Sequence, residues 1–557
     1  IIDDVNELDN KMHSVTPVYS QMEGIKQGIM RNIIAQAVKA GDGSLFSVLP
    51  EGREEKFKLL PLRDAIRYVH GHDVPVFSYE KVQQCIRRMI LEEYFQFQVT
   101  LIARKRKARK EKGIAFQTDG DIHGQFLKKL GFELTGSQKR VIAEIMSDMA
   151  RPTPMNRLLQ GDVGSGKTVC AVAAACTAID NGYQVAFMAP TEILAEQHYL
   201  NVHRWFKDLG IPVVLLKGNL GKERARLLVE IRAGTIPIVI GTHALIQSDV
   251  EFSRLGLAIV DEQHRFGVDQ RKKLGTKSRF PDVLNMTATP IPRTLSMVIY
   301  GDLDISIIDT MPAGRQKIVT KVLADHDRQK ARTLIGKELE KGSGVFIVYP
   351  VIDESELDGV RDARGMAQHL KNVFPGKSVG LRHGRMNSGE KEDIMYAFRS
   401  GNIDILVCTT VVEVGIDVPR ATMMVIENAE RFGLSQLHQL RGRVGRGSRA
   451  SQCILLPSSV KTPLASKRLK IMEKTSDGFV IAEEDLRIRG VGDMLGIRQS
   501  GLPPFRIGDI VRDIDIMTEA RKIAEDFVTG LSDRQMQSVL EAIGPRFDDT
   551  RKLSTIA

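Results

Sequence analysis

The segment GDVGSGKT at residues 161–168 constrains the fold of this chain more than any other feature. It fits the pattern G-x-x-x-x-G-K-[ST] and stands between an apolar run, MNRLLQ, and a run of small helix-forming residues, VCAVAAACTAI. A loop that joins a strand to a helix N-terminus cradles phosphates, because backbone N–H groups and the helix dipole both face the anion. The sequence therefore predicts a nucleotide-binding α/β domain.

Each part of the loop has an expected role. The glycines allow the sharp turn, Lys167 reaches the β and γ phosphates, and the Thr168 hydroxyl holds Mg²⁺. The predicted nucleotide contacts are Gly161, Asp162, Val163, Gly164, Ser165, Gly166, Lys167 and Thr168.

Short β-rich apolar runs alternate with helical stretches around this loop. The runs begin at Met155, Tyr183, Pro212, Pro237, Leu255 and Val283. After the turn-rich MPAGRQ at residues 311–316 the alternation restarts, with runs that begin at Val345, Ile405, Met423 and Cys453. Strands alternating with helices are typical of βαβ units and a parallel sheet. The sequence thus predicts two parallel α/β domains in series.

Both ends of the chain have sequence patterns typical of helices. Apolar residues at steps of three or four between Val82 and Leu101 predict a long helix over 79–112 with one apolar face. The helix ends in RKRKARKEK, which either grips phosphates or is a solvated helix end. We expect four parts: a helical N-terminal segment (1–115), an ATP-binding domain (116–312), a second α/β domain (313–460) and a C-terminal helical region (461–557).

Composition excludes several classes of protein. With 42% hydrophobic and 27% charged residues, the 557-residue chain is neither disordered nor collagen-like. A membrane protein is excluded because no window has the roughly 18 uninterrupted apolar residues of a membrane span. Five cysteines without C-x-x-C spacing indicate a reduced, metal-free set and a cytoplasmic protein.

Charge and the first residues are weaker guides. The net charge of +10 favours a polyanionic partner, although a solvated basic face is the commoner explanation. The opening IIDDVNELDN has no basic region followed by an apolar core, so it is not a secretory signal. Because it lacks an initiator Met, we expect the true start to lie upstream.

An acidic pair indicates hydrolysis rather than binding alone. The apolar run LGLAIV delivers Asp261 and Glu262 to its carboxyl end. Asp261 can hold Mg²⁺, and Glu262 can orient and deprotonate the attacking water. The alternative is a surface acidic pair that merely ends a strand.

The second α/β domain contains an arginine pair in QLRGRVGR, at residues 439–446. Arg443 and Arg446 are three residues apart, so both can point the same way from a helical turn. Planar, permanently charged guanidinium groups suit the charge of a transferring phosphoryl group. We predict that they act across a cleft between the two domains; the alternative is an arginine-rich surface helix.

The motifs, taken together, resemble those of superfamily 2 helicases, which have two tandem RecA-like domains. The segments that carry this resemblance are GDVGSGKT, APTEILAEQH, GTHALI, DEQHRFGVDQR, TATPIPRT, TTVVEVGIDVPRA and QLRGRVGR, in that order. More narrowly, DEQHRFGV, TATPIPRTL, YPVIDESE and DGFVIAEEDLRIRGVGDMLGIRQSG are similar to the RecG family, bacterial ATP-dependent helicases of branched DNA. The last segment resembles that family's translocation motif.

The resemblance implies an ATP- and Mg²⁺-dependent motor that moves on duplex DNA and remodels stalled forks and Holliday junctions in recombination and repair. Two features depart from the family pattern. Residues 1–115 do not read as the family's oligonucleotide-binding wedge domain, so we expect a motor without its wedge. Val491 stands where a proline is expected.

The resemblance also implies residue roles. Phe132 and Gln138 would stack on and read adenine, and Gln439 would act with Lys167, Asp261, Glu262, Arg443 and Arg446 in catalysis. His264, which is expected to meet Gln439, would couple hydrolysis to DNA contact together with Thr287 and Thr289. The expected DNA contacts are Thr191, Thr242, His243, Thr409, Arg487, Arg489 and Gln499; for the last three a structural salt-bridge network is the alternative.

The expected partners are branched and duplex DNA, with a single-stranded DNA-binding protein as a further partner, and the expected state is a monomer in the bacterial cytoplasm near the nucleoid. Three rival functions stay open. One is the motor of a transcription-repair coupling translocase, which shares the late motif. Another is a nucleic-acid scaffold that ATP merely switches, against which the complete hydrolytic set argues. The third is an RNA motor, since residue spacing and charge do not separate RNA from DNA.

Overall fold

The computed structural model describes a chain of two compact units. The described residues are 17–20, 24–41, 47–49, 53–71, 78–218, 221–262, 281–288, 296, 303–312, 317–350, 356–409, 418–445, 447, 449–458, 462–494, 505–510 and 512–544. One unit comprises Ile1–Lys107, Met297–Asp302 and Arg498–Ser554, and the other comprises Ala108–Ser296, Leu303–Ile497 and Thr555–Ala557. Among the described residues, no helix is both long enough and apolar enough to cross a membrane.

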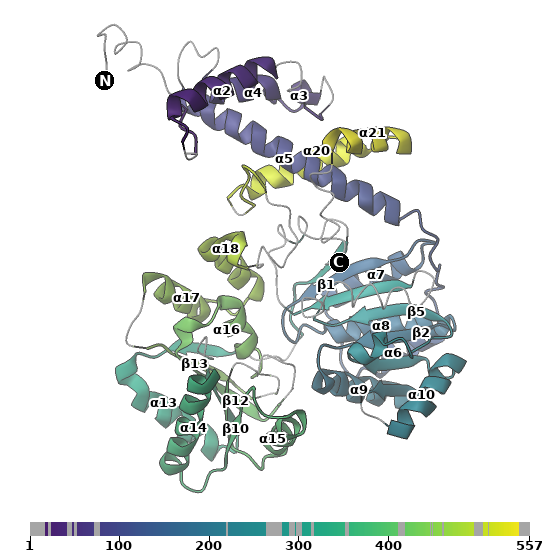
Figure 1. Cartoon of the computed structure of the whole chain (residues 1–557). Helices are drawn as coiled ribbons and strands as arrows, with labels where there is room; N and C mark the ends of the chain where they lie inside the picture. Colours follow the sequence, from purple (N-terminus) through teal and green to yellow (C-terminus); the bar gives the residue numbers. More distant parts are fainter. Residues whose placement is uncertain are drawn as a thin grey trace. The chain divides into compact units, whose positions relative to one another are not determined.

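The first unit is helical. Its helices are α2 (Gln27–Ala40), α3 (Arg53–Lys56), α4 (Leu62–Val69), α5 (Tyr79–Ala108), α20 (Ile514–Val528) and α21 (Asp533–Ile543). The long α5 runs beside α20 and α21 (Figure 1). The predicted helix exists, but it ends at Ala108 rather than Lys112, and its middle is buried on nearly every side instead of one face.

Rings and carboxylates hold α5 to the C-terminal part of the unit. Tyr94 and Phe97 both make edge-on contacts with Phe505, at 5.0 and 5.3 Å between ring centroids. Within the basic run, Arg106 donates to the carbonyl of Leu531 at 2.6 Å and lies 3.4 Å from the Asp533 carboxylate. Part of the basic run is therefore neither a phosphate grip nor a solvated end, because it anchors α21.

The second unit contains two parallel sheets. The first has the order β3-β4-β2-β5-β6-β1-β7. Its strands are β1 (Asn156–Gly161), β2 (Gln184–Met188), β3 (Val213–Leu216), β4 (Ile238–Gly241), β5 (Leu255–Val260), β6 (Asp282–Thr287) and β7 (Asp304–Ile308). Buried runs such as LGLAIV in β5 form central strands because both faces of a parallel sheet are covered.

Helices cover both faces of this sheet. Apolar side chains of α6 (Asp121–Lys129), α7 (Gly136–Met149), α8 (Lys167–Asp180) and α9 (Glu192–Lys207) form one core with strand residues that include Phe187 and Ile259. On the opposite face, α10 (Gly221–Ala233) and the short η1 (His243–Ile246) pack against residues such as Met188 and Val260.

The second sheet has the order β10-β11-β9-β12-β13-β8. Its strands are β8 (Val319–Val322), β9 (Gly344–Tyr349), β10 (Val379–Arg382), β11 (Ile405–Thr409), β12 (Ala421–Glu427) and β13 (Gln452–Leu456). One face packs against α13 (Arg328–Glu340) and α14 (Glu356–Val373). The other packs against α15 (Ser388–Ser400), α16 (Leu434–Arg441), α17 (Pro463–Lys474) and α18 (Gly478–Met494).

The predicted fold class is confirmed: two parallel α/β domains lie in series, with helical segments at both ends. The sequence patterns missed β7, β8 and β10. All three are edge strands, and an edge strand is covered by fewer neighbours than a central one. In β8, for example, Val319 is exposed while Thr320 is buried, so the strand lacks the continuous apolar run by which the central strands were found.

Candidate nucleotide site and nucleic-acid surface

The phosphate-binding loop joins β1 to α8, as the motif predicts. Gly164 and Gly166 have φ values of +77° and +91°, which L side chains rarely adopt. A Cβ atom at Gly166 would also lie 2.2 Å from Nε2 of Gln138. The third glycine of the motif is therefore required by both its backbone angle and its neighbour.

Lys167 is buried at the start of α8. Its Nζ donates to the carbonyl oxygens of Gly161 and Asp162, at 2.8 and 3.0 Å. The Oγ of Ser165 is buried without a hydrogen-bond partner in the described part of the chain. Since buried hydroxyls are normally hydrogen-bonded, this loop has a donor to offer to a ligand.

Gln138 lies directly beside this loop. It completes a capping box with Thr135 at the start of α7, its Oε1 accepting from the Thr135 N–H at 2.9 Å. Its Nε2 donates to the Ser165 carbonyl at 2.8 Å. Phe132, six residues earlier, is 49% exposed and thus open to a stacking partner.

The acidic pair follows β5, at the carboxyl edge where the loop also lies. Asp261 is buried, and its Oδ2 is 2.8 Å from Nε2 of His198 on α9. Its Oδ1 accepts from the N–H of Glu262 at 3.0 Å. Burial alone would raise the pKa of Asp261, but His198 and then Lys167 outweigh it, so the pKa lies below its usual value.

Glu262 is in the opposite electrostatic situation. Burial and the neighbouring Asp261 charge raise its pKa, while Lys167 and Arg443 act to lower it. Its φ is +51°, and its Oε2 accepts from the N–H of Ala288 at 3.3 Å, beyond the end of β6. Glu262 therefore lies within electrostatic reach of Lys167, Asp261 and Arg443.

Two residues of the predicted arginine motif are buried on or just after α16. Gln439 lies within the helix, and Arg443 follows its end. Arg446 lies outside the described residues, so the predicted pairing of the two arginines keeps its status as a prediction. The same holds for His264 and its expected contact with Gln439.

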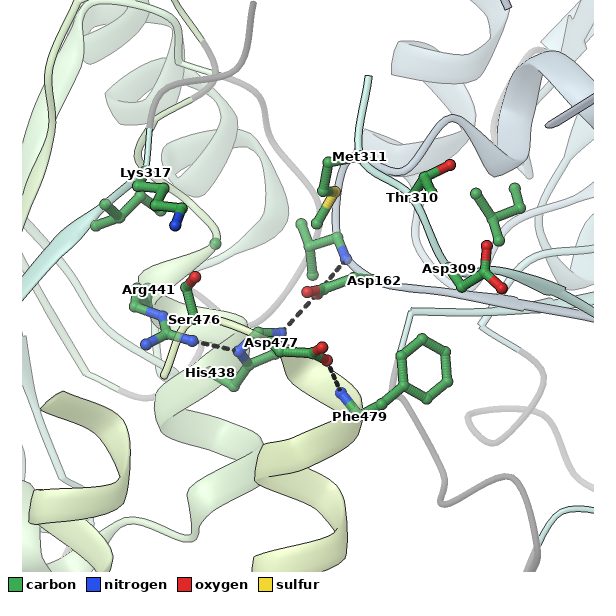
Figure 2. A pocket seen from close by; sticks show the side chains of 14 residues that line it. Asp162, Asp309, Thr310, Met311, Lys317, His438, Arg441, Ser476, Asp477 and Phe479 are labelled. Atoms are coloured by element: carbon green, nitrogen blue, oxygen red, sulfur yellow. Dashed lines mark hydrogen bonds and ion pairs between the residues drawn. The ribbon is translucent and has the colours of Figure 1, made fainter. Parts of the chain in front are cut away.

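A cavity of about 290 Å³ lies beside the phosphate loop (Figure 2). The loop contributes Asp162 and Val163 to its lining. The other lining residues are Ile308, Asp309, Thr310, Met311, Lys317, Ile318, His438, Arg441, Gly442, Ser476, Asp477 and Phe479. Three elements therefore line the cavity: the end of β7, the turn before α18, and α16, which we call the motif helix because it carries the first residues of QLRGRVGR.

Four of the residues predicted to contact DNA lie at or shortly after the carboxyl ends of strands: Thr191, Thr242, His243 and Thr409. Thr191 caps α9 by accepting from the N–H of Leu194 at 3.4 Å, and His243 is exposed at the start of η1. The hydroxyls of Thr242, after β4, and Thr409, at the end of β11, are buried without a partner among the described residues. Such hydroxyls are suited to accept a ligand's hydrogen bond or to donate to phosphate.

The remaining predicted residues are described only in part. Thr287 is buried at the end of β6. Arg487 is exposed on α18 and donates to Glu484 at 2.8 Å. The backbone of Arg489 belongs to α18, whereas Gln499 and Thr289 lie outside the described residues.

The sequence patterns did not predict that two histidines, His198 and His438, contact residues of this site. His198 binds Asp261, and His438 binds Asp162 at 2.6 Å. Each histidine stands at or next to a motif already identified, at the end of APTEILAEQH and directly before QLRGRVGR. Proximity to a motif was the available signal, but only folding shows which carboxylate each ring meets.

Three family descriptions match successive parts of the chain. Residues 135–298 match the DEAD/DEAH box helicase family, and residues 329–448 match the helicase conserved C-terminal domain. Residues 475–552 match ATP-dependent DNA helicase RecG, domain 3, C-terminal. The last match covers the whole segment, residues 477–501, whose resemblance to a translocation motif was predicted.

Curated relatives and a solved structure agree with these matches. The chain is 47% identical over 518 residues to the ATP-dependent DNA helicase RecG of Synechocystis sp., covering 92% of this chain and 62% of that relative. It is 45% identical over 531 residues to the Bacillus subtilis RecG, covering 94% of this chain and 77% of that relative. A structure of RecG bound to a three-way DNA junction has a TM-score of 0.69 and 42% identity, covering 90% of this chain and 66% of that one.

The resemblance inferred from the motifs is confirmed, and so are the two RecA-like domains that it implied. The comparisons give no support to a transcription-repair coupling translocase or to an ATP-switched scaffold. The extent and identity of these matches establish that the chain belongs to the RecG family of ATP-dependent DNA helicases.

Proposed function

We propose that this chain is the motor of a branched-DNA helicase: it hydrolyses ATP to translocate on duplex DNA and remodels stalled forks and Holliday junctions in recombination and repair. The observation that carries the proposal is the position of Glu262, whose pKa responds to Asp261 and Lys167 of the first RecA-like domain and to Arg443 of the second. The relative solved with a three-way junction supports branched DNA as the substrate.

The nucleotide fits the residues present. The positive φ of Gly164 and Gly166, together with the buried Ser165 hydroxyl, forms a cradle whose donors suit phosphate oxygens. Thr168 and Asp261 are the residues proposed to hold Mg²⁺, which supplies charge neutralisation of the phosphates when bound. The depressed pKa of Asp261 keeps its carboxylate ionised, as a ligand of a hard cation must be.

In the proposed reaction, Glu262 orients the attacking water and accepts its proton. Burial and Asp261 raise the pKa of Glu262, which makes it a better base than an exposed carboxylate. Arg443 and Arg446 stabilise the charge that develops on the transferring phosphoryl group, and Gln439 helps to position the water. Because these three come from the second domain, hydrolysis depends on the approach of the two domains.

The DNA contacts and the coupling residues follow the motifs. The hydroxyls of Thr242 and Thr409, which have no hydrogen-bond partner within the described ranges, support backbone phosphate contacts at the ends of β4 and β11. Thr191, His243, Arg487, Arg489 and Gln499 complete the proposed DNA surface, and His264, Thr287 and Thr289 the proposed coupling path. The Arg487–Glu484 ion pair leaves the structural alternative open for that residue.

The remaining expectations are part of the same proposal. They are the four-part division at residues 115, 312 and 460, a monomeric state, a single-stranded DNA-binding protein as partner, and a place in the cytoplasm near the nucleoid. The chain spans 62% of the Synechocystis relative and 77% of the Bacillus one.

The test is the steady-state ATPase rate with no nucleic acid, single-stranded DNA, linear duplex, a three-way fork and a matching RNA duplex. Lys167→Ala serves as the blank. We expect strong stimulation by duplex or forked DNA and little by RNA. A rate that none of these substrates changes would overturn the proposed motor function of this chain.

A further inference from the structure

A buried chain of hydrogen bonds joins the phosphate loop to the motif helix α16 (Figure 2). His438 Nε2 lies 2.6 Å from Asp162 Oδ1, and His438 Nδ1 lies 2.8 Å from Arg441 Nη2. All three side chains are buried. Buried polar chains of this kind are stable only when each member is satisfied, so the three residues form one unit.

The chemistry of the partners decides the protonation of the ring. Arginine is a permanent donor, so Nδ1 of His438 must accept from Arg441. The remaining proton then lies on Nε2 and is donated to the Asp162 carboxylate. A neutral histidine with this tautomer is one of few side chains that can donate at one edge and accept at the other; glutamine is another.

The chain of hydrogen bonds continues from Arg441 to the segment that connects α17 to α18. Its Nη1 donates to the carbonyl oxygens of Met472 and Thr475, at 3.0 and 2.8 Å. Two residues further on, Asp477 lies directly before α18, and its carboxylate accepts from the N–H of Phe479 at 2.8 Å. Movement of Arg441 would therefore displace the residues just before the N-terminus of α18, the helix that carries Arg487.

At its other end, the chain of hydrogen bonds begins at Asp162, which also contacts Lys167. The carbonyl oxygen of Asp162 accepts from Lys167 Nζ at 3.0 Å, while its carboxylate accepts from His438. When the lysine turns toward a phosphate, the carbonyl loses this partner. Gly442, directly after α16, also lies close to the loop, since a Cβ there would lie 3.1 Å from Val163.

We propose that His438 is a positioning residue that transmits the nucleotide state of the phosphate loop, through Asp162 and Arg441, to the start of α18. This inference rests on the proposed function, in which α18 belongs to the DNA-translocating part. Nucleotide binding shifts Asp162 in the phosphate loop, and the shift moves His438 and, through it, Arg441. Arg441 in turn displaces the carbonyl groups that precede α18.

The test measures hydrogen exchange of the amides in residues 472–480 with and without a non-hydrolysable ATP analogue. In the wild type, the analogue is expected to change these exchange rates. His438→Ala is expected to abolish that change while altering the Kd of the analogue less than about threefold. His438→Gln, which retains one donor and one acceptor, is expected to restore the change.

A matched control comes from the same domain. Nε2 of His369 lies 3.1 Å from Arg332 on the surface, so His369→Ala removes an Arg–His contact that touches neither the loop nor α17. It should leave the exchange response intact. An unchanged response in His438→Ala, or no response in the wild type, would overturn the inference.

DNA stimulation of the ATPase separates this inference from the proposed function. If His438→Ala lowers the stimulation by about tenfold with basal KM preserved, both stand. If no DNA stimulates the wild type while the exchange response still depends on His438, the proposed function fails and the transmission stands. Thermal unfolding of each variant shows whether a lost response merely reflects loss of the fold.

Discussion

The side-chain amide of Gln138 donates to the backbone carbonyl of Ser165 at 2.8 Å. The same side chain caps its own helix by accepting from the N–H of Thr135. One residue thus ties the start of α7 to the middle of the phosphate loop, apart from any direct contact with a base. Its expected role as an adenine reader has a second, structural component.

Gln138→Ala should therefore weaken nucleotide binding more than turnover at saturating ATP. The loop carbonyl loses its donor and α7 loses half of its capping box, which costs about 1 kcal/mol. We expect KM for ATP to rise by about tenfold and kcat to fall less. Lys139→Ala, at the exposed neighbouring position, is the control; equal losses in both variants would argue against the loop contact.

Lys167→Ala should abolish ATP turnover and leave the fold intact. The ammonium is expected to bind the β and γ phosphates, and alanine is a favourable helix residue at the start of α8. The steady-state ATPase rate and the far-ultraviolet circular dichroism spectrum check the two halves of this statement. Retained turnover would refute the catalytic assignment.

Removal of either predicted arginine finger should reduce kcat more than nucleotide affinity. The guanidinium charge matters most when charge develops on the transferring phosphoryl group. For Arg446→Ala and Arg443→Ala we expect a fall in kcat of about a hundredfold or more, with the Kd of an ATP analogue changed by less than about threefold. A proportional loss of binding and turnover would instead indicate a structural role.

Asp282 should make the stability of the chain depend on pH. Burial first, and the Asp148 charge second, raise the pKa of this carboxyl to about 8. The folded protein therefore keeps a proton that the unfolded chain, with a pKa of about 4, has lost. This contribution to stability is fully present below about pH 4 and is lost as the pH rises to about 8.

Asp282→Asn should remove that dependence, because an amide does not titrate and its oxygen can still accept from the N–H of Met155. Denaturant unfolding of both proteins at several pH values measures the difference. The stability gap between variant and wild type should widen by at most about 1.4 kcal/mol for each pH unit. A constant gap between pH 5 and pH 8 would contradict the shifted pKa.

Glu93 should hold the chain segment that follows residue 504 against α5. Its two carboxylate oxygens accept from the N–H groups of Arg506, Ile507 and Gly508, at 2.7, 3.2 and 3.0 Å. Glu93→Gln replaces one oxygen with a donor, which then faces an N–H group. Hydrogen exchange at these three amides should accelerate by at least about tenfold.

Glu92→Gln is the matched control for this change. Glu92, the preceding residue of α5, is equally buried, but it accepts from Ser47 and Val48 and pairs with Arg88. Its substitution should accelerate exchange at Val48 and leave the amides of residues 506–508 protected. The same pattern in both variants would mean that α5 itself had loosened.

Local patterns were sufficient for the fold class and for much of the candidate site. Continuous apolar runs identified the central strands, because a strand covered on both faces must be apolar along its length. The phosphate loop, with its glycines, Lys167 and Thr168, could be read directly, since its chemistry is local. The edge strands β7, β8 and β10 were missed because partial exposure removes the continuous apolar run.

The sequence by itself determined which groups are present and on which kind of element each lies. Only the tertiary structure decided which of them meet: His198 with Asp261, His438 with Asp162, and Arg441 with the carbonyls before α18. Along the sequence, Asp162 lies 276 residues from His438, whereas Arg441 lies only three residues from it. No local spacing encodes the first of these, because strand order and helix packing bring the two domains' residues together.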